Sequence, residues 1–332
     1  MTTTGSSRVF TPFYRRWLAT PRRQLLEAPA SLRAFHLVGT TDRSRSARAA
    51  PVARPATRRG GERAAVARLT TWRDGSIARY GEHRDDLPEP ATSGLSADLH
   101  FGSLSPLAVE AALDGVPGAV PFLRQLCWRD FYLQILAARP DAAWSDYVPR
   151  SGRPRRDRVA FEAWCSGHTG IPIVDAAMRQ LADEGFLTNR ARMIAASFLT
   201  RNLGLDWRDG ARHFLEHLID ADVGLNNLNW QWMAGLGTGA NPQRVLSPTR
   251  QARRLDPLGS YVRRHLPELR RLGAAAVHEP WRLGRSELAR LGYPAPIVPV
   301  GGVAARATSR WDRPQRDLQT GDGPPFSEEM NQ

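Results

Sequence analysis

The sequence of 332 residues contains no lysine, so all 46 of its basic residues are arginines. Against 33 acidic residues they leave a formal net charge of +13. Arginine presents a planar set of donors that suits bidentate contacts with phosphate. The excess favours a polyanionic partner such as nucleic acid, or an acidic membrane surface. A coding bias toward arginine explains the same composition equally well.

Cysteine and long apolar runs are also scarce. The only cysteines, Cys127 and Cys165, are too few for a disulfide framework and form no C-x-x-C pair. This favours a reducing compartment and argues against a metal or iron–sulfur site. No stretch approaches the roughly 20 apolar residues of a membrane span. The N-terminal residues lack the apolar core of a signal peptide. We therefore expect a cytoplasmic protein.

Strand-like alternation is scarce too, whereas helical signals recur from about residue 62. Serine, threonine and aspartate favour helix starts, proline suits the first turn, and glycine often ends a helix. These rules predict helix starts at Ser105-Pro106, Pro172, Thr188 and Asp206, and a helix end at Gly185. We expect an all-α fold.

Three segments are expected. Residues 1–61 contain no βαβ pattern and read as a connector followed by a linker rich in Arg, Ser, Ala and Pro. Residues 62–296 form the helical domain. Residues 297–332, ending in Gly, Pro and charged residues, are expected to be disordered.

Polar and aromatic side chains are concentrated at residues 220–232, DADVGLNNLNWQW. Buried Asp and Asn are costly unless they are hydrogen-bonded. Beside two large indoles, they favour a pocket for a flat ligand with polar edges. Taken alone, helix caps and turns explain the same Asp and Asn residues.

Further motifs accompany this run in a fixed order: VFTPF at 9–13, Tyr80 with TSGLS at 92–96, HFGSLSP at 100–106, WRDFY at 128–132, TGIPIVDAAMRQL at 169–181, NRARM at 189–193 and HEPW at 278–281. Together they resemble the DNA photolyase/cryptochrome family from about residue 9 to about residue 296. The resemblance implies the helical FAD-binding domain of that family. The family's N-terminal α/β antenna domain is expected to be absent, so no antenna chromophore is expected.

The resemblance also implies how FAD is held. Arg192 pairs with Asp220, and Asp222 meets the flavin edge or the ribityl chain. Asn226 faces the flavin N5, where a neutral amide suits the fully reduced flavin of repair enzymes. Gly94 replaces a usual arginine in the phosphate-binding turn. The expected cofactor-binding residues are Tyr80, Thr92, Ser93, Leu95, Ser96, Arg129, Arg192, Asp220, Asp222 and Asn226.

A second set of residues resembles the family's substrate cavity. Trp128 and Trp232 correspond to the aromatic walls that stack a flipped-out base, although core packing is the ordinary role of tryptophan. Asn189 and Met193 stand where enzymes for the (6-4) photoproduct have histidines, which favours the cyclobutane dimer. Gln125 replaces a usual glutamate, which puts efficiency in question rather than substrate class.

Two smaller groups complete the implied site. Arg190 and Arg244 resemble DNA-phosphate contacts, and an exposed solubilising role is the alternative for Arg190. Trp230 and Trp207 resemble the first two members of the tryptophan relay that photoreduces the flavin. The usual third tryptophan falls near Pro154 and is missing.

The sequence thus predicts a light-driven lyase that repairs cyclobutane pyrimidine dimers in UV-damaged DNA, acting as a monomer. A cryptochrome-like blue-light photosensor without repair activity is one alternative. A degenerate nucleic-acid-binding remnant without a working cofactor is another.

Overall fold

A computed structural model of the protein describes residues 7–26, 29, 31, 59–150, 152–239 and 245–299. These residues are largely helical and contain no strand, only an isolated bridge between Arg155 and Leu205. No helix among them is both long enough and apolar enough to span a membrane. The all-α expectation is confirmed.

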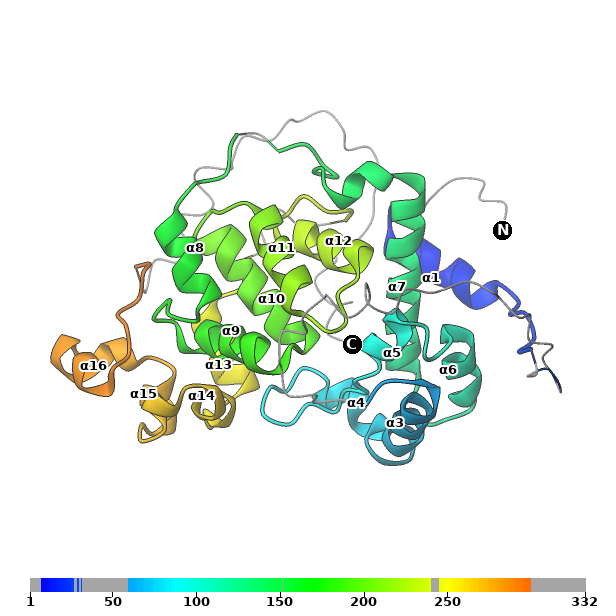
Figure 1. Ribbon diagram of the computed structural model, residues 1–332, viewed down its shortest axis with the longest axis horizontal. Coiled ribbons are helices and arrows are strands. Elements are labelled where there is room, and N and C mark those ends of the chain that lie inside the picture. The colour runs from blue at the N-terminus through cyan, green and yellow to red at the C-terminus, as the bar shows by residue number, and fades with distance from the viewer. Residues whose placement is uncertain are drawn as a thin grey trace, which may run out of the picture.

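The longest helix, α7 (Val120–Ala138), separates two helical groups (Figure 1). Around one end of α7 lie α3 (Glu62–Gly75), α4 (Ile77–His83), α5 (Ser96–His100) and α6 (Pro106–Ala112). They share a core that includes Trp72, Tyr80 and Phe122, and Phe122 comes from α7 itself. The turn at residues 92–96 belongs to this group and lines the cavity described below.

The larger group contains α8 (Arg158–Cys165), α9 (Pro172–Glu184), α10 (Asn189–Ser197), α11 (Trp207–His217) and α12 (Val223–Met233). A π-helical turn, η2 (Phe198–Asn202), extends α10. Such turns are rare and frequently occur at functional sites. At the periphery lie α13 (Pro248–Leu255), α14 (Ser260–His265), α15 (Ala274–Val277) and α16 (Arg285–Leu291), with 3-10 turns η1 (Pro140–Ala143), η3 (Pro267–Leu269) and η4 (Pro280–Leu283).

The predicted helix boundaries have local causes. Thr188 and Asp206 cap α10 and α11, and accept hydrogen bonds from backbone N–H groups at 3.4 and 3.1 Å. Gly185 ends α9 with a φ of 64°, a left-handed conformation that other residues rarely adopt. Ser105 precedes α6 as expected, but its side chain makes no cap hydrogen bond.

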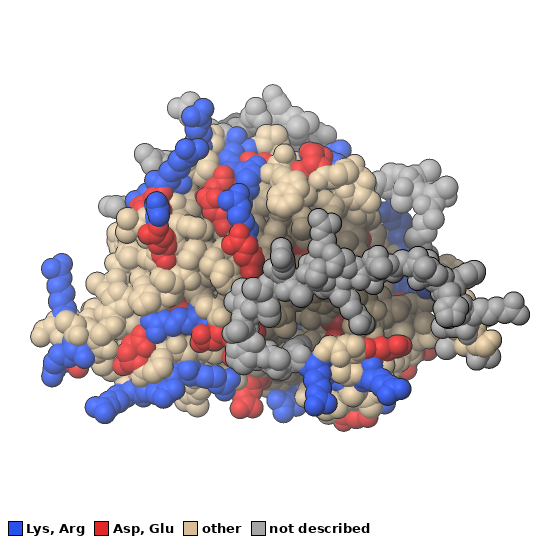
Figure 2. Space-filling model, in the orientation of Figure 1, with Lys and Arg blue, Asp and Glu red and all other residues tan. Residues whose placement is uncertain are grey.

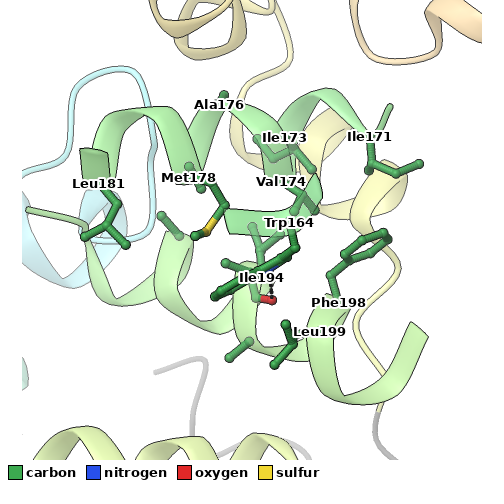
Figure 3. Close-up of a cluster of buried hydrophobic side chains, with 14 of the residues drawn as sticks. Trp164, Ile171, Ile173, Val174, Ala176, Met178, Leu181, Ile194, Phe198 and Leu199 are labelled. Carbon is green, nitrogen blue, oxygen red and sulfur yellow. Dashed lines mark hydrogen bonds between the residues drawn. The ribbon is translucent and has the colours of Figure 1, made fainter. Parts of the chain in front are cut away.

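The core of the larger group is built around Trp164, which has no exposed surface (Figure 3). Its indole N–H donates to the carbonyl of Ala195 at 3.1 Å, so the ring is buried without an unpaired polar atom. Its ring centre lies 6.0 Å from those of Phe214 and Trp230. This stack ties α8 to α11 and α12, which carry part of the site described below.

One helix was not predicted. Residues Phe10–Ala19 form α1, which lies alongside α7 (Figure 1). Phe10, Phe13, Tyr14 and Trp17 follow the i, i+3, i+4, i+7 spacing of one helical face, and Phe10 is the one that is fully buried. Docking on α7 stabilises it, as tertiary packing commonly does for short helices.

The net positive charge is not confined to one stripe on the face drawn in Figure 2, where acidic groups are interspersed with arginines. Several arginines of the described residues are paired, including Arg150 with Asp146 at 2.6 Å and Arg179 with Glu268 at 2.8 Å. Ion pairs with Asp and Glu side chains therefore account for part of the arginine content.

Candidate active site

A cavity of about 320 Å³ lies where the two helical groups meet across α7. Its polar lining comes from α4, the turn at 92–96, α7, α10, the segment between α11 and α12, and α12 itself. All ten residues expected to bind a cofactor line it: Tyr80, Thr92, Ser93, Leu95, Ser96, Arg129, Arg192, Asp220, Asp222 and Asn226. The fold thus brings together side chains that are up to 146 positions apart in the sequence.

Arg192 and Asp220 form the ion pair that the sequence suggested. One guanidinium nitrogen lies 2.7 and 3.0 Å from the two carboxylate oxygens. The carboxylate is only 2% exposed and the guanidinium 26%. Burial opposes ionisation of Asp220, but the charge and hydrogen bond of Arg192, with a hydrogen bond from Ser96, hold its pKa below the usual value. The pair fixes a charged edge on the cavity wall.

Asp222 combines a structural and a cavity-facing role. It is the N-cap of α12 and accepts a hydrogen bond from the backbone N–H of Leu225 at 2.8 Å. Its other oxygen lies 3.6 Å from Nδ1 of His100, a residue that also lines the cavity. The cap thereby fixes a carboxylate at the cavity rim.

Asn226 lies one turn further along α12. Its side-chain nitrogen donates to the carbonyl of Ala211 at 3.0 Å and to Oδ1 of Asn227 at 2.9 Å. An amide nitrogen carries two hydrogens, and both are used in these bonds. The side-chain oxygen is therefore the atom that Asn226 offers to the cavity, as a hydrogen-bond acceptor.

The five residues expected at the substrate line the same cavity: Gln125, Trp128, Asn189, Met193 and Trp232. Asn189 and Met193 share one face of α10, with the amide nitrogen 3.6 Å from the sulfur. The two indoles come from different helices, α7 and α12. The cavity thus combines a polar edge with aromatic walls.

The two expected relay tryptophans differ in position. Trp230 lines the cavity, whereas Trp207 is buried away from it and donates its indole N–H to Asp146 at 2.8 Å. Trp164 packs against Trp230 with ring centres 6.0 Å apart, and Trp144 is 60% exposed. Trp164 is therefore a buried indole in direct contact with Trp230.

Arg190 does not have the exposed placement expected of a DNA contact. It is 5% exposed and forms an ion pair with Asp85, a residue in the segment between α4 and the turn at 92–96. A phosphate contact from this conformation would require that pair to open. Arg244 lies outside the described residues.

Sequence reasoning missed the apolar lining of the cavity. It includes Phe122, Leu126, Phe214, Leu218 and Met233. An apolar residue on a helical face has the same sequence pattern whether it meets another helix or a cavity. Only the three-dimensional arrangement separates the two cases.

No metal ligand was expected, yet His213, Glu216 and His217 lie together on α11 with their ligand atoms within 4.8 Å of one another. Nδ1 of His217 is 2.8 Å from the carbonyl oxygen of His213. These three residues do not line the cavity.

The residues present fit a flavin dinucleotide. A flat ring system needs apolar walls, which Phe214, Leu218 and Trp230 supply, and polar partners at its edges, which Asp222 and Asn226 supply. The hydroxyls of the turn at 92–96 suit a phosphate group. The fold and this cavity define a helical flavin-binding domain.

Comparisons with known proteins agree. Residues 122–313 match the family model described as the FAD binding domain of DNA photolyase. A deoxyribodipyrimidine photo-lyase of Streptomyces griseus is 49% identical over 300 residues, which cover 90% of this chain and 66% of that protein. The chain belongs to the photolyase FAD-binding domain family, and it spans just under two thirds of this relative's length.

Solved structures show the same fold. A bacterial class III photolyase from Agrobacterium tumefaciens superposes with a TM-score of 0.84 at 35% identity, covering 92% of this chain and 68% of that one. A cryptochrome from Synechocystis gives 0.71 at 34% identity, covering 76% and 56%. The expected family and fold are confirmed.

Proposed function

We propose that this chain binds FAD and carries out light-driven repair of cyclobutane pyrimidine dimers in DNA, as a deoxyribodipyrimidine photo-lyase. The observation that carries the proposal is the cavity lined both by the flavin-suited polar residues and by Trp128, Trp232, Asn189 and Met193. A cofactor and a flipped-out pyrimidine dimer bound there would lie side by side. Short-range electron transfer needs that proximity.

Reduced FAD, once bound, would supply an electron on illumination and recover it after the dimer splits, so there is no net redox change. The protein holds and positions the cofactor and the substrate. The Arg192–Asp220 pair fixes the charged edge, and the Asn226 oxygen offers an acceptor without an ionisable proton. A neutral amide at this place would have no acidic proton to give to a bound flavin, which would favour the fully reduced cofactor.

The substrate class follows from what the cavity wall can and cannot do. Splitting a cyclobutane ring requires electron transfer, whereas (6-4) repair also needs a proton donor such as histidine. Asn189 and Met193 supply an amide and a thioether, neither of which titrates near neutral pH. Gln125 can hydrogen-bond a pyrimidine edge but carries no charge, so we expect it to lower the rate rather than change the substrate.

The proposal extends to the surroundings of the reaction. UV-damaged DNA is the proposed partner, the protein is proposed to act as a monomer, and we place it in the cytoplasm. The arginine excess supports a nucleic-acid partner.

A photosensor without repair activity is the second candidate, because a Synechocystis cryptochrome has the same fold. Binding of damaged DNA separates the two. Trp232→Ala removes one proposed stacking wall, worth about 1–3 kcal/mol per base, so affinity for dimer-containing DNA should fall roughly 5- to 150-fold. Trp144→Ala, which removes an indole that is 60% exposed and outside the cavity, is the matched control.

Affinities for a dimer-containing duplex and for the same undamaged duplex would be compared at one salt concentration. Trp232→Ala should reduce the preference for damage, and Trp144→Ala should leave it unchanged. Wild-type protein that carries FAD but has no preference for the dimer would favour the photosensor.

A further inference from the structure

The face of Trp128 that does not meet the cavity is covered by a ring from α1. The ring centres of Phe10 and Trp128 lie 3.7 Å apart, and the planes differ by only 2°. Phe10 is 4% exposed, so this stack is buried. Phe131 closes the same group edge-on, with its centre 5.6 Å from that of Phe10 and 5.4 Å from that of Trp128.

Several contacts hold Phe10 in this place. The backbone of Ser7 exchanges hydrogen bonds with the side chain of Gln134, at 3.1 and 2.9 Å. At the other end of α1, the indole N–H of Trp17 donates to Asp130 at 2.9 Å. Both partners lie on α7, on either side of Phe131, so α1 is fixed along α7 rather than at one point.

The residues just before α1 also contact the segment that follows α12. The hydroxyl of Thr238 donates to the carbonyl of Arg8, two residues before Phe10. Thr238 belongs to the turn after α12. Gly237 in the same turn packs against the backbone of Trp232, because a Cβ added to Gly237 would lie 2.7 Å from the backbone nitrogen of Trp232. Residues 8–10 therefore join the segments that carry both aromatic walls.

We infer that Phe10 is a positioning residue of the substrate cavity. It packs against one face of Trp128 and fixes the orientation of that indole, so that the other face is available for stacking. The inference rests on the proposed function. An indole packed on one face keeps a fixed orientation, so less rotational freedom is lost when a base stacks on the other face. Residues 7–19 are then part of the substrate site rather than a connector beside it.

The inference predicts a specific loss. Without Phe10, Trp128 can rotate into the space that the ring leaves. Aromatic pairs of this kind contribute enough beyond simple burial that Phe10→Ala should weaken binding of dimer-containing DNA roughly three- to tenfold. Binding of undamaged DNA, which does not insert a base, should be nearly unchanged. FAD content should be unchanged too, because Phe10 does not line the cavity.

Phe13→Ala is the matched control. This substitution removes an aromatic ring of the same size from the same helix. The Phe13 ring packs against Phe131, with ring centres 5.4 Å apart, and not against Trp128. A general loosening of α1 would affect both variants equally. Phe10→Tyr, which keeps the ring, should restore wild-type binding.

A second measurement does not depend on DNA. Protein labelled with 5-fluorotryptophan gives one fluorine resonance per indole, and Trp128→Phe identifies the one from Trp128. Phe10→Ala should shift or broaden that resonance, and Phe13→Ala should leave it close to its wild-type position. An unchanged Trp128 resonance in Phe10→Ala would overturn the inference, whatever the protein binds.

The two measurements separate the possible failures. If wild-type protein prefers dimer DNA and Phe10→Ala keeps that preference in full, Phe10 does not position the wall. If wild-type protein has no preference for the dimer, the proposed function is wrong, and the Trp128 resonance in Phe10→Ala then tests by itself whether Phe10 holds the indole. Support requires a shifted resonance, weaker dimer binding and rescue by Phe10→Tyr together.

Discussion

Replacing Asp220 by Asn tests the buried ion pair on which the cavity edge depends. Removing one partner of a fully buried pair costs about 3–5 kcal/mol because it leaves an uncompensated charge. Here the Arg192 guanidinium is 26% exposed, so water can stabilise part of its charge, and Asn keeps an acceptor oxygen. We therefore expect the free energy of unfolding to fall by about 2–3 kcal/mol.

For a helical domain of about 230 residues, an unfolding entropy of roughly 2.1 cal/mol/K per residue makes about 0.5 kcal/mol equivalent to 1 °C. The Tm of Asp220→Asn should then fall by about 4–6 °C. Differential scanning calorimetry at one fixed concentration of added FAD would measure it, since bound ligand raises the Tm. The same samples report FAD content, which we expect to decrease.

Asp141→Asn is the control for this experiment. Asp141 pairs with Arg139 at 2.8 Å, but the two side chains are 57% and 43% exposed. Exposed pairs contribute little, so the Tm should change by less than about 1 °C. Equal effects of the two substitutions would refute the reasoning that burial gives the Asp220 pair its strength.

The pH dependence of the same variant has a definite sign. Burial opposes ionisation of Asp220, but the charge and hydrogen bond of Arg192 hold its folded-state pKa below the usual value. A lowered pKa contributes stability that is fully present above the unfolded value and is lost as pH falls through the folded one. The stability difference between wild type and Asp220→Asn should stay constant from pH 7 to about pH 5 and shrink below about pH 4. A difference that disappears already at pH 6 would contradict this.

Three further predictions concern α11 and α12. In urea unfolding, Gly210→Ala should destabilise the protein by about 1–3 kcal/mol, because the added Cβ would lie 2.3 Å from Cη2 of Trp230. Gly75→Ala is the control: its added Cβ would have nothing within 4 Å, so it should be neutral or slightly stabilising. Trp207→Phe should abolish long-lived charge separation after a flash, and unchanged transient absorption would exclude Trp207 from the relay. Asn226→Asp places an ionisable group at the cavity, so flavin spectra during photoreduction should show a long-lived neutral radical that the wild type lacks; identical spectra would argue against the assigned place of Asn226.

Local chemistry made the helix boundaries predictable from the sequence. Thr188, Asp206 and Gly185 act through their own backbone neighbours, so their roles do not depend on the rest of the fold. Helix α1 was missed although Phe10, Phe13, Tyr14 and Trp17 have the spacing of one helical face, because the segment was interpreted as a connector. Its one fully buried residue, Phe10, is stabilised by contacts with α7, more than 110 positions away in the sequence.

The same distinction holds in the site. The order of the motifs predicted one site, and the fold places residues as distant as Tyr80 and Asn226 around one cavity. Arg190 shows the limit, because its burial depends on an ion pair with Asp85 that no local pattern indicates. The stack behind Trp128 could not be predicted either, since ring orientation is set by packing between helices.

The most direct test of the proposed function is repair by the purified chain itself. Protein with bound, chemically reduced FAD would be mixed with an oligonucleotide that contains one thymine dimer and exposed to blue light, with a dark sample and a Trp232→Ala sample alongside. The account predicts that intact thymines accumulate over many turnovers in the lit wild-type sample alone, and far more slowly in Trp232→Ala. Flavin-loaded, reduced wild-type protein that leaves the dimer intact in light would contradict it.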